Sequence, residues 1–125
     1  MSAEQELNAA LKAAGAVTSI VGAGNSARIY PELIPLEIDP PYIAYSRTGT
    51  EYTTTIHSSV PIGEDVTLDI WCMATTKAGA DALASAVIPA VGAAGFRLLG
   101  RAAVMPDAER DLIATSLTVT KYRPL

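Results

Sequence analysis

The strongest pattern in the chain lies in residues 64–91, which read EDVTLDIWCMATTKAGADALASAVIPAV. Every second residue of its first half is apolar: Val66, Leu68, Ile70 and Cys72. That period is typical of a strand with one buried face. From Ala80 to Val91, apolar residues return at steps of three and four, as on a helix that lies against a sheet. The sequence therefore predicts a strand that runs directly into a helix, with no room for a catalytic loop between them.

Weaker patterns predict the remaining elements. Ser2 and Gln5 fit a capping box for a first helix that runs to about Ala14, with Gly15 as its stop. Thr75 or Thr76 caps the later helix, and Pro89 ends or kinks it. The other expected strands span residues 28–30, 42–46, 96–104 and 112–122, and prolines make residues 31–41 an extended connector. In the strand 96–104 we expect Phe96, Leu98, Ala102 and Val104 on one face and Arg97 and Arg101 on the other.

Residues 48–63, TGTEYTTTIHSSVPIG, are long, polar and β-branched. Threonine favours strands, but the segment has no continuous apolar face that would hold it against a core. It is either a projecting hairpin arm, which becomes ordered on contact with a partner, or a disordered loop. We favour the arm, whose expected contact residues are Glu51, Tyr52, Thr54, Ile56 and His57.

Together these elements predict one α+β domain over residues 1–125. We expect a mainly antiparallel sheet of about four to five strands, packed against two helices, with a long projecting hairpin or loop. The chain has 22 alanines and seven aromatic residues, so the core is built from small side chains. Such a core gives modest stability to a monomer and leaves room for stabilisation by partner subunits.

Charge and hydropathy exclude some partners. The net charge of −4 argues against specific nucleic-acid binding, which needs a basic field. Residues 1–70 carry nine acids and three bases (−6), whereas residues 71–125 carry four acids and six bases (+2). This split suits head-to-tail self-association, although scatter over a solvated surface explains it equally well. With no export signal or membrane-spanning run, we expect folding in the reducing cytoplasm and no membrane partner.

A search for catalytic, cofactor and metal sites finds none. Gly22-Ala23-Gly24 lacks the third glycine, strand and helix of a dinucleotide site, so a plain turn is expected. His57, the only histidine, has no ligand at zinc spacing and no fixed partner for general-base catalysis. Cys72, the only cysteine, belongs to the apolar row of its strand and is expected to be buried and unreactive.

The acidic side chains do not converge either. Glu64 and Asp65 point to opposite faces of a strand, and Asp65 and Asp69 lie about 13 Å apart at roughly 3.3 Å per residue. That separation is too large for a pair of catalytic acids. The remaining acids, Asp107, Glu109 and Asp111, are expected in a solvated turn.

Trp71 does not belong to the apolar row of its strand. It shares the opposite face with Asp69, and pairing with the next strand would add Arg97 and Arg101 to that face. Tryptophan and arginine together are typical of protein–protein contacts. The alternative is that the first helix covers Trp71 and makes it part of the core.

The order of segments resembles a known family. ARIYP is followed by PPYIAYS, a variable polar loop, VTLDIWCMA, the helix TTKAGADALASAV and a final strand SLTVTKY. This order resembles the tail completion or tail terminator proteins of long-tailed bacteriophages and gene transfer agents, over nearly the whole chain.

The resemblance implies a non-enzymatic protein without a cofactor. Family members form a ring, usually of six copies, that caps the finished tail tube, ends its polymerisation and offers a surface to the head-side connector. The expected partners are therefore further copies of this chain, the tail tube protein and the connector, in the tail or neck of a particle made in bacterial cytoplasm. Two alternatives remain: a head-completion or connector protein of the same particle, and a small-ligand module with a polar pocket between helices and sheet.

Overall fold

A computed structural model describes residues 2–22, 24, 27–31, 40–57, 59–107 and 112–124. In chain order the elements are α1 (Ala3–Ala13), α2 (Gly15–Val21), β1 (Ile29–Pro31), β2 (Tyr42–Thr54), β3 (Pro61–Ala74), α3 (Lys77–Ala93), β4 (Arg97–Asp107) and β5 (Leu112–Pro124). The predicted α+β class is confirmed. Most of the predicted connector 31–41 lies outside the described residues, as do parts of the turn after Gly22. The charged turn predicted around Asp107, Glu109 and Asp111 is partly wrong: β4 continues to Asp107, and Glu109 and Asp111 lie outside the described residues.

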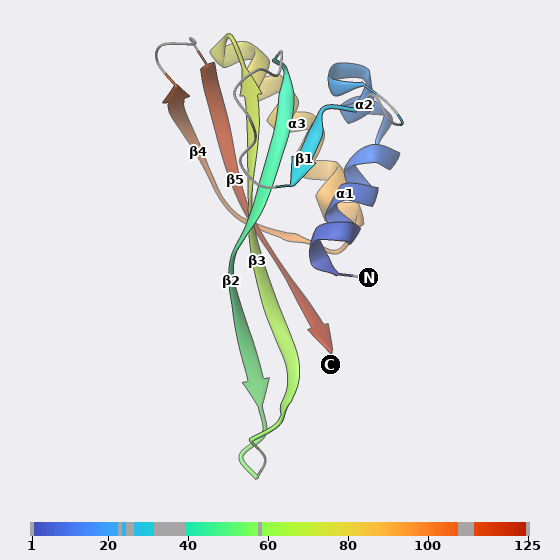
Figure 1. The fold of residues 1–125 in the computed structure, drawn as a ribbon, viewed down its shortest axis with the longest axis vertical. Coiled ribbons are helices and arrows are strands. Elements are labelled where there is room, and N and C mark those ends of the chain that lie inside the picture. Colours follow the sequence, from blue (N-terminus) through green and yellow to red (C-terminus); the bar gives the residue numbers. More distant parts are fainter. Residues whose placement is uncertain are drawn as a thin grey trace.

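The five described strands form one sheet in the order β1-β2-β3-β5-β4. Only the short β1 runs parallel to its neighbour, and the other three pairings are antiparallel. All three described helices lie on one side of this sheet, and the opposite side carries none (Figure 1). The mainly antiparallel sheet follows prediction, but a third helix, α2, stands beside the two expected.

The core fills the space between the helices and one face of the sheet. The alternating row of β3 is fully buried there, as predicted: its members are Val66, Leu68, Ile70 and Cys72. From the helices, Leu7 and Leu11 of α1 and Leu83 of α3 join the same cluster. Burying one such side chain stabilises the fold by about 1.5–3 kcal/mol, so this cluster is what holds the helices to the sheet.

The helix ends follow local capping chemistry with two differences. Ser2 and Gln5 form the predicted capping box, and the Thr76 side chain accepts a hydrogen bond from the Gly79 amide at 3.0 Å. The first helix ends at Ala13, and the extended backbone of Ala14 separates α1 from α2, so Gly15 begins a helix instead of ending one. Pro89 does not end α3, which continues to Ala93, because proline interrupts one backbone bond while the apolar stripe goes on to a buried Val91.

β2 and β3 are far longer than predicted. They stay paired from Tyr42 opposite Met73 to Thr54 opposite Pro61, and their outer part projects beyond the helices (Figure 1). We call residues 49–65 the arm. Gly63 lies within it, under the Tyr122 ring of β5; a β-carbon at this position would collide with that ring. The hairpin alternative for residues 48–63 is thus the correct one, and its strands are paired within this single chain.

Candidate assembly surface

The arm places large apolar side chains in solvent. Ile56 at its tip is 96% exposed and Tyr52 on β2 is 61% exposed. Val60 and Ile62 of the returning strand are exposed as well, and so is Tyr122, beside the arm on β5. A monomer gains almost nothing from Ile56 and only part of the possible burial energy from the others, whereas a partner that covered them would gain the rest.

The arm is also acidic. Its three ionisable carboxylates are Glu51, Glu64 and Asp65, and it contains no lysine or arginine. Glu51 stands directly opposite Asp65 across the two strands, an arrangement of like charges that weakens a hairpin. Such a pair does not serve the stability of the arm itself, and it gives the arm a field that favours a basic surface.

All five residues predicted for the arm are exposed on it, namely Glu51, Tyr52, Thr54, Ile56 and His57. The prediction missed three apolar members of this surface, Val60, Ile62 and Tyr122. Val60 and Ile62 were visible in the sequence as apolar residues inside a polar stretch. Tyr122 could not be recognised in this way, because its position beside Gly63 depends on the pairing of β3 with β5.

The side of the sheet without helices carries Asp69 and Trp71 from the second group of predicted residues. Asp69 accepts a hydrogen bond at 2.9 Å from Thr118 on the neighbouring strand. Trp71 is partly buried in a small cluster with Tyr30 and Tyr42. The first helix does not cover Trp71, since α1 packs on the other face with the core. The predicted covering of Trp71 by the first helix is therefore wrong, and Trp71 packs instead against a second apolar cluster that contains Tyr42.

Arg97 and Arg101 do not share a face as predicted. Arg97 lies opposite Thr120, on the side without helices, whereas Arg101 lies opposite the core residue Leu117. A β-bulge between Leu98 and Gly100 adds one residue to the strand and reverses the alternation beyond it. The same reversal separates Leu98 from Ala102, which were expected on one face.

Beyond this bulge, Arg101 faces helix α3. Its guanidinium donates a hydrogen bond at 3.1 Å to Asp81, which also accepts one at 3.1 Å from the Thr115 hydroxyl. The Arg101 bond, and then the Thr115 bond, hold the pKa of Asp81 below its ordinary value. Arg101 is therefore engaged within the fold although it is exposed, whereas Arg97, also exposed, lies on the side of the sheet without helices.

β4 also exposes large apolar side chains. Leu98 and Leu99 are both exposed, Leu99 by 52%. Leu99 is the extra residue of the bulge, and Leu98 lies opposite the core residue Val119 without joining the core cluster, which Phe96 enters. β4 is the last strand of the sheet, at one margin of the molecule in Figure 1.

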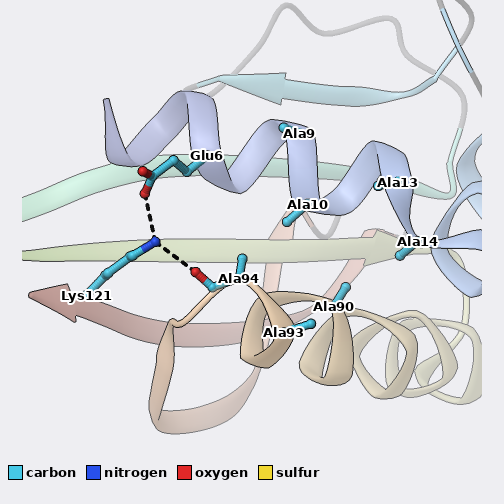
Figure 2. A pocket seen from close by; sticks show the side chains of 9 residues that line it. All are labelled: Glu6, Ala9, Ala10, Ala13, Ala14, Ala90, Ala93, Ala94 and Lys121. Atoms are coloured by element: carbon cyan, nitrogen blue, oxygen red, sulfur yellow. Dashed lines mark hydrogen bonds and ion pairs between the residues drawn. The ribbon is translucent and has the colours of Figure 1, made fainter. Parts of the chain in front are cut away.

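A groove of about 550 Å³ lies between α1 and α3. Figure 2 shows its lining of seven alanines with one charged pair at its end. In that pair, the Lys121 ammonium donates to Glu6 at 2.9 Å and to the Ala94 carbonyl at 2.8 Å. Both charged groups are thus engaged with the protein, and the remaining walls offer only methyl groups. This groove does not have the convergent polar lining that a small-ligand module needs.

The titratable residues singled out in the sequence are dispersed. His57 lies on the arm, exposed to solvent, and Cys72 is buried in the core, where burial raises the pKa of its thiol to about 12. Among the described residues, no group of three His, Cys, Asp or Glu side chains is arranged to hold a metal ion. None of the described helices is long and apolar enough to cross a membrane.

Comparison with known proteins supports the class that this arrangement suggests, a protein that acts through its surfaces. The family model described as Tail completion protein gp17 matches residues 5–118. The chain therefore belongs to the tail completion protein gp17 family, and so to the structural proteins of phage tail and virion assembly. No individually curated protein matches the chain.

One similar solved structure is described as "Virion of native gene transfer agent (GTA) particle". The matched chain has 16% sequence identity and a TM-score of 0.60, and the match covers 99% of this chain and 96% of that one. At this identity the likeness concerns the fold, which is shared over nearly the full length of both chains.

Proposed function

We propose that this protein forms a ring at the end of the tail tube, stops the growth of the tube and offers a surface for joining the head. The ring has six copies in this proposal, and the partners are the tail tube protein and the head-side connector. The chain acts without a cofactor and without catalysis. It is made in the bacterial cytoplasm and resides in the tail or neck of the particle.

The observation that carries the proposal is the arm. It projects past the helices and ends in an almost fully exposed isoleucine, and its two strands set carboxylates against each other. These features disfavour the isolated chain and favour an assembled one. Membership of a tail completion family supports the tail as the place of that assembly.

The side of the sheet without helices provides a second surface. Trp71 and Arg97 lie there, and tryptophan and arginine are the residues that most often dominate protein contacts. A ring protein needs at least two kinds of contact, one between copies and one to its neighbours in the particle. The arm and this face give two such surfaces on one chain.

The test combines particle mass with tube capping. The purified chain is expected to form a closed oligomer by light scattering, to bind the ends of purified tail tubes in electron micrographs, and to halt polymerisation of added tube protein. A variant without the arm, in which residues 51–65 are replaced by Asn-Gly, joins two strand positions that face each other, Thr50 and Val66.

This arm-less variant should keep its fold, since none of the removed residues belongs to the main core cluster and the bordering Val66 is retained. Its circular dichroism serves as the control, and it should lose ring formation or capping. Ring yield and capping equal to those of the complete chain would refute the role of the arm. A complete chain that stays monomeric and ignores tube ends would refute the proposed function.

A further inference from the structure

Two edges of the sheet are open, and they lie on opposite sides of the molecule. β1 covers β2 only at Ile43–Tyr45, so within the described residues no strand pairs with the outer side of β2 along the arm. At the other margin no described strand pairs with the outer side of β4. Open edges present unpaired backbone donors and acceptors, to which another strand can add.

We propose that the arm of one copy pairs, as an antiparallel strand, with the β4 edge of the next copy. This inference rests on the proposed function, because it specifies the contact between copies in the ring. The contact is head-to-tail, since the two edges differ, and head-to-tail contacts close into rings when the rotation permits.

Charge and apolar surface agree at the two edges. Glu51 lies on β2, the arm strand at the open edge, with Glu64 and Asp65 behind it on β3, and the exposed part of β4 carries Arg97 and Arg101. Both edges also expose large apolar side chains, Tyr52 on one and Leu99 on the other. Pairing would bring an acidic apolar strand against a basic apolar one, which favours the mixed contact over arm–arm or β4–β4 contacts.

Strand direction agrees as well. β2 is antiparallel to β3, β3 to β5 and β5 to β4, so β2 and β4 run in opposite directions. In a closed sheet, neighbouring copies related by the ring rotation keep these directions at their shared edge. The arm of one copy and β4 of its neighbour are then antiparallel, which is the more stable kind of pairing.

The required offset is compatible with a closed ring. Arg97 stands level with Gly49, where the arm begins, and β4 runs away from the arm. The next copy must therefore be displaced along the strands by the length of the arm, about 20 Å for six residues at about 3.3 Å each. Four strands per copy span about 19 Å across the sheet at roughly 4.8 Å per strand. The displacement along the strands is therefore about equal to the width across the sheet. Strands tilted by about 45° from the ring axis have this proportion, and closed sheets adopt a similar tilt.

Cysteine cross-linking tests the contact. Thr53→Cys and Thr54→Cys sample both faces of the arm, and Leu99→Cys and Ala103→Cys sample exposed positions of β4. The native Cys72 is buried and does not interfere. With oxidised glutathione as oxidant, at least one mixture of an arm variant with a β4 variant should form covalent dimers, whereas each variant alone should not. A chain that carries both cysteines should give a ladder up to the mass of the ring.

The controls separate this inference from the proposed function. Ser85→Cys, exposed on α3, should not cross-link with either edge. Arm variants that cross-link with themselves, or a ring that forms by light scattering while no arm–β4 mixture cross-links, would overturn the edge pairing and leave the ring standing. A chain that is monomeric at all concentrations would overturn both.

Charge reversal gives an independent readout. Glu51→Lys and Arg97→Glu should each slow association at low salt, because each removes attraction between the edges. The two changes in one chain should restore the association rate, since a lysine on the arm of one copy then meets a glutamate on β4 of the next. A double variant that associates no faster than the single ones would contradict the proposed charge match.

Discussion

Replacing Ile56 with serine separates folding from assembly. The side chain is 96% exposed, so the folded monomer loses almost no burial energy when it is shortened. The free energy of unfolding should change by less than about 0.5 kcal/mol, as for other surface substitutions. A partner that buries this side chain, in contrast, gains about 1.5–3 kcal/mol from it. Because about 1.4 kcal/mol is a factor of ten in Kd, each contact should weaken by about 10- to 100-fold.

Two measurements check this expectation on the same samples. Thermal unfolding should give equal midpoints for Ile56→Ser and the unaltered chain, and sedimentation over a dilution series should show the oligomer dissociating at higher concentration. Ala16→Ser, at an exposed position of α2, is the matched control and should change neither. If oligomer dissociation and tube capping are both the same as in the unaltered chain, the tip of the arm is not buried in any partner and the reasoning fails.

Three further predictions concern the fold. Gly63→Ala should destabilise the chain by about 0.5–1 kcal/mol, because its β-carbon displaces the half-exposed Tyr122 ring, and adding Tyr122→Ala should remove most of that loss in chemical denaturation. The Lys121 hydrogen bond holds the pKa of Glu6 below its ordinary value of 4.5. This pair therefore stabilises the fold fully above pH 4.5, and the stabilisation is lost as the pH falls through the lowered pKa. Lys121→Met should flatten the acidic part of a curve of unfolding free energy against pH. With a pKa of about 12, Cys72 should resist iodoacetamide at pH 8 in the native chain and react only after unfolding, and rapid native labelling would contradict its burial.

The period of apolar residues was sufficient to locate a helix or strand in the sequence where one face of that element is buried. The alternation of Val66, Leu68 and Ile70 located β3, and the spacing from Ala80 to Val91 located α3. Capping chemistry at Ser2 succeeded for the same reason, since its partners are three residues away. These features depend on neighbours in sequence and are therefore visible in it.

Features that depend on pairing between distant residues were missed. The bulge at Leu99 arises in the ladder between β4 and β5, and simple alternation from Phe96 could not reveal it. Arg101 was placed on the wrong face as a result. The arm itself was predicted, but not that β2 and β3 continue through it as paired strands, because its residues have no buried face and the apolar period that reveals β3 is absent there.

The arm continues two strands of the sheet, and its direction has a mechanical consequence. At its root Arg47 binds Glu4 of α1 at 2.6 Å, so the helix layer is fastened to the same point. A pull on the tip acts along the strands and shears many ladder bonds at once, whereas a pull across them would open the bonds one after another. The molecule is therefore oriented to resist tension along the arm, and a subunit gripped there would transmit force into its whole sheet before it yielded.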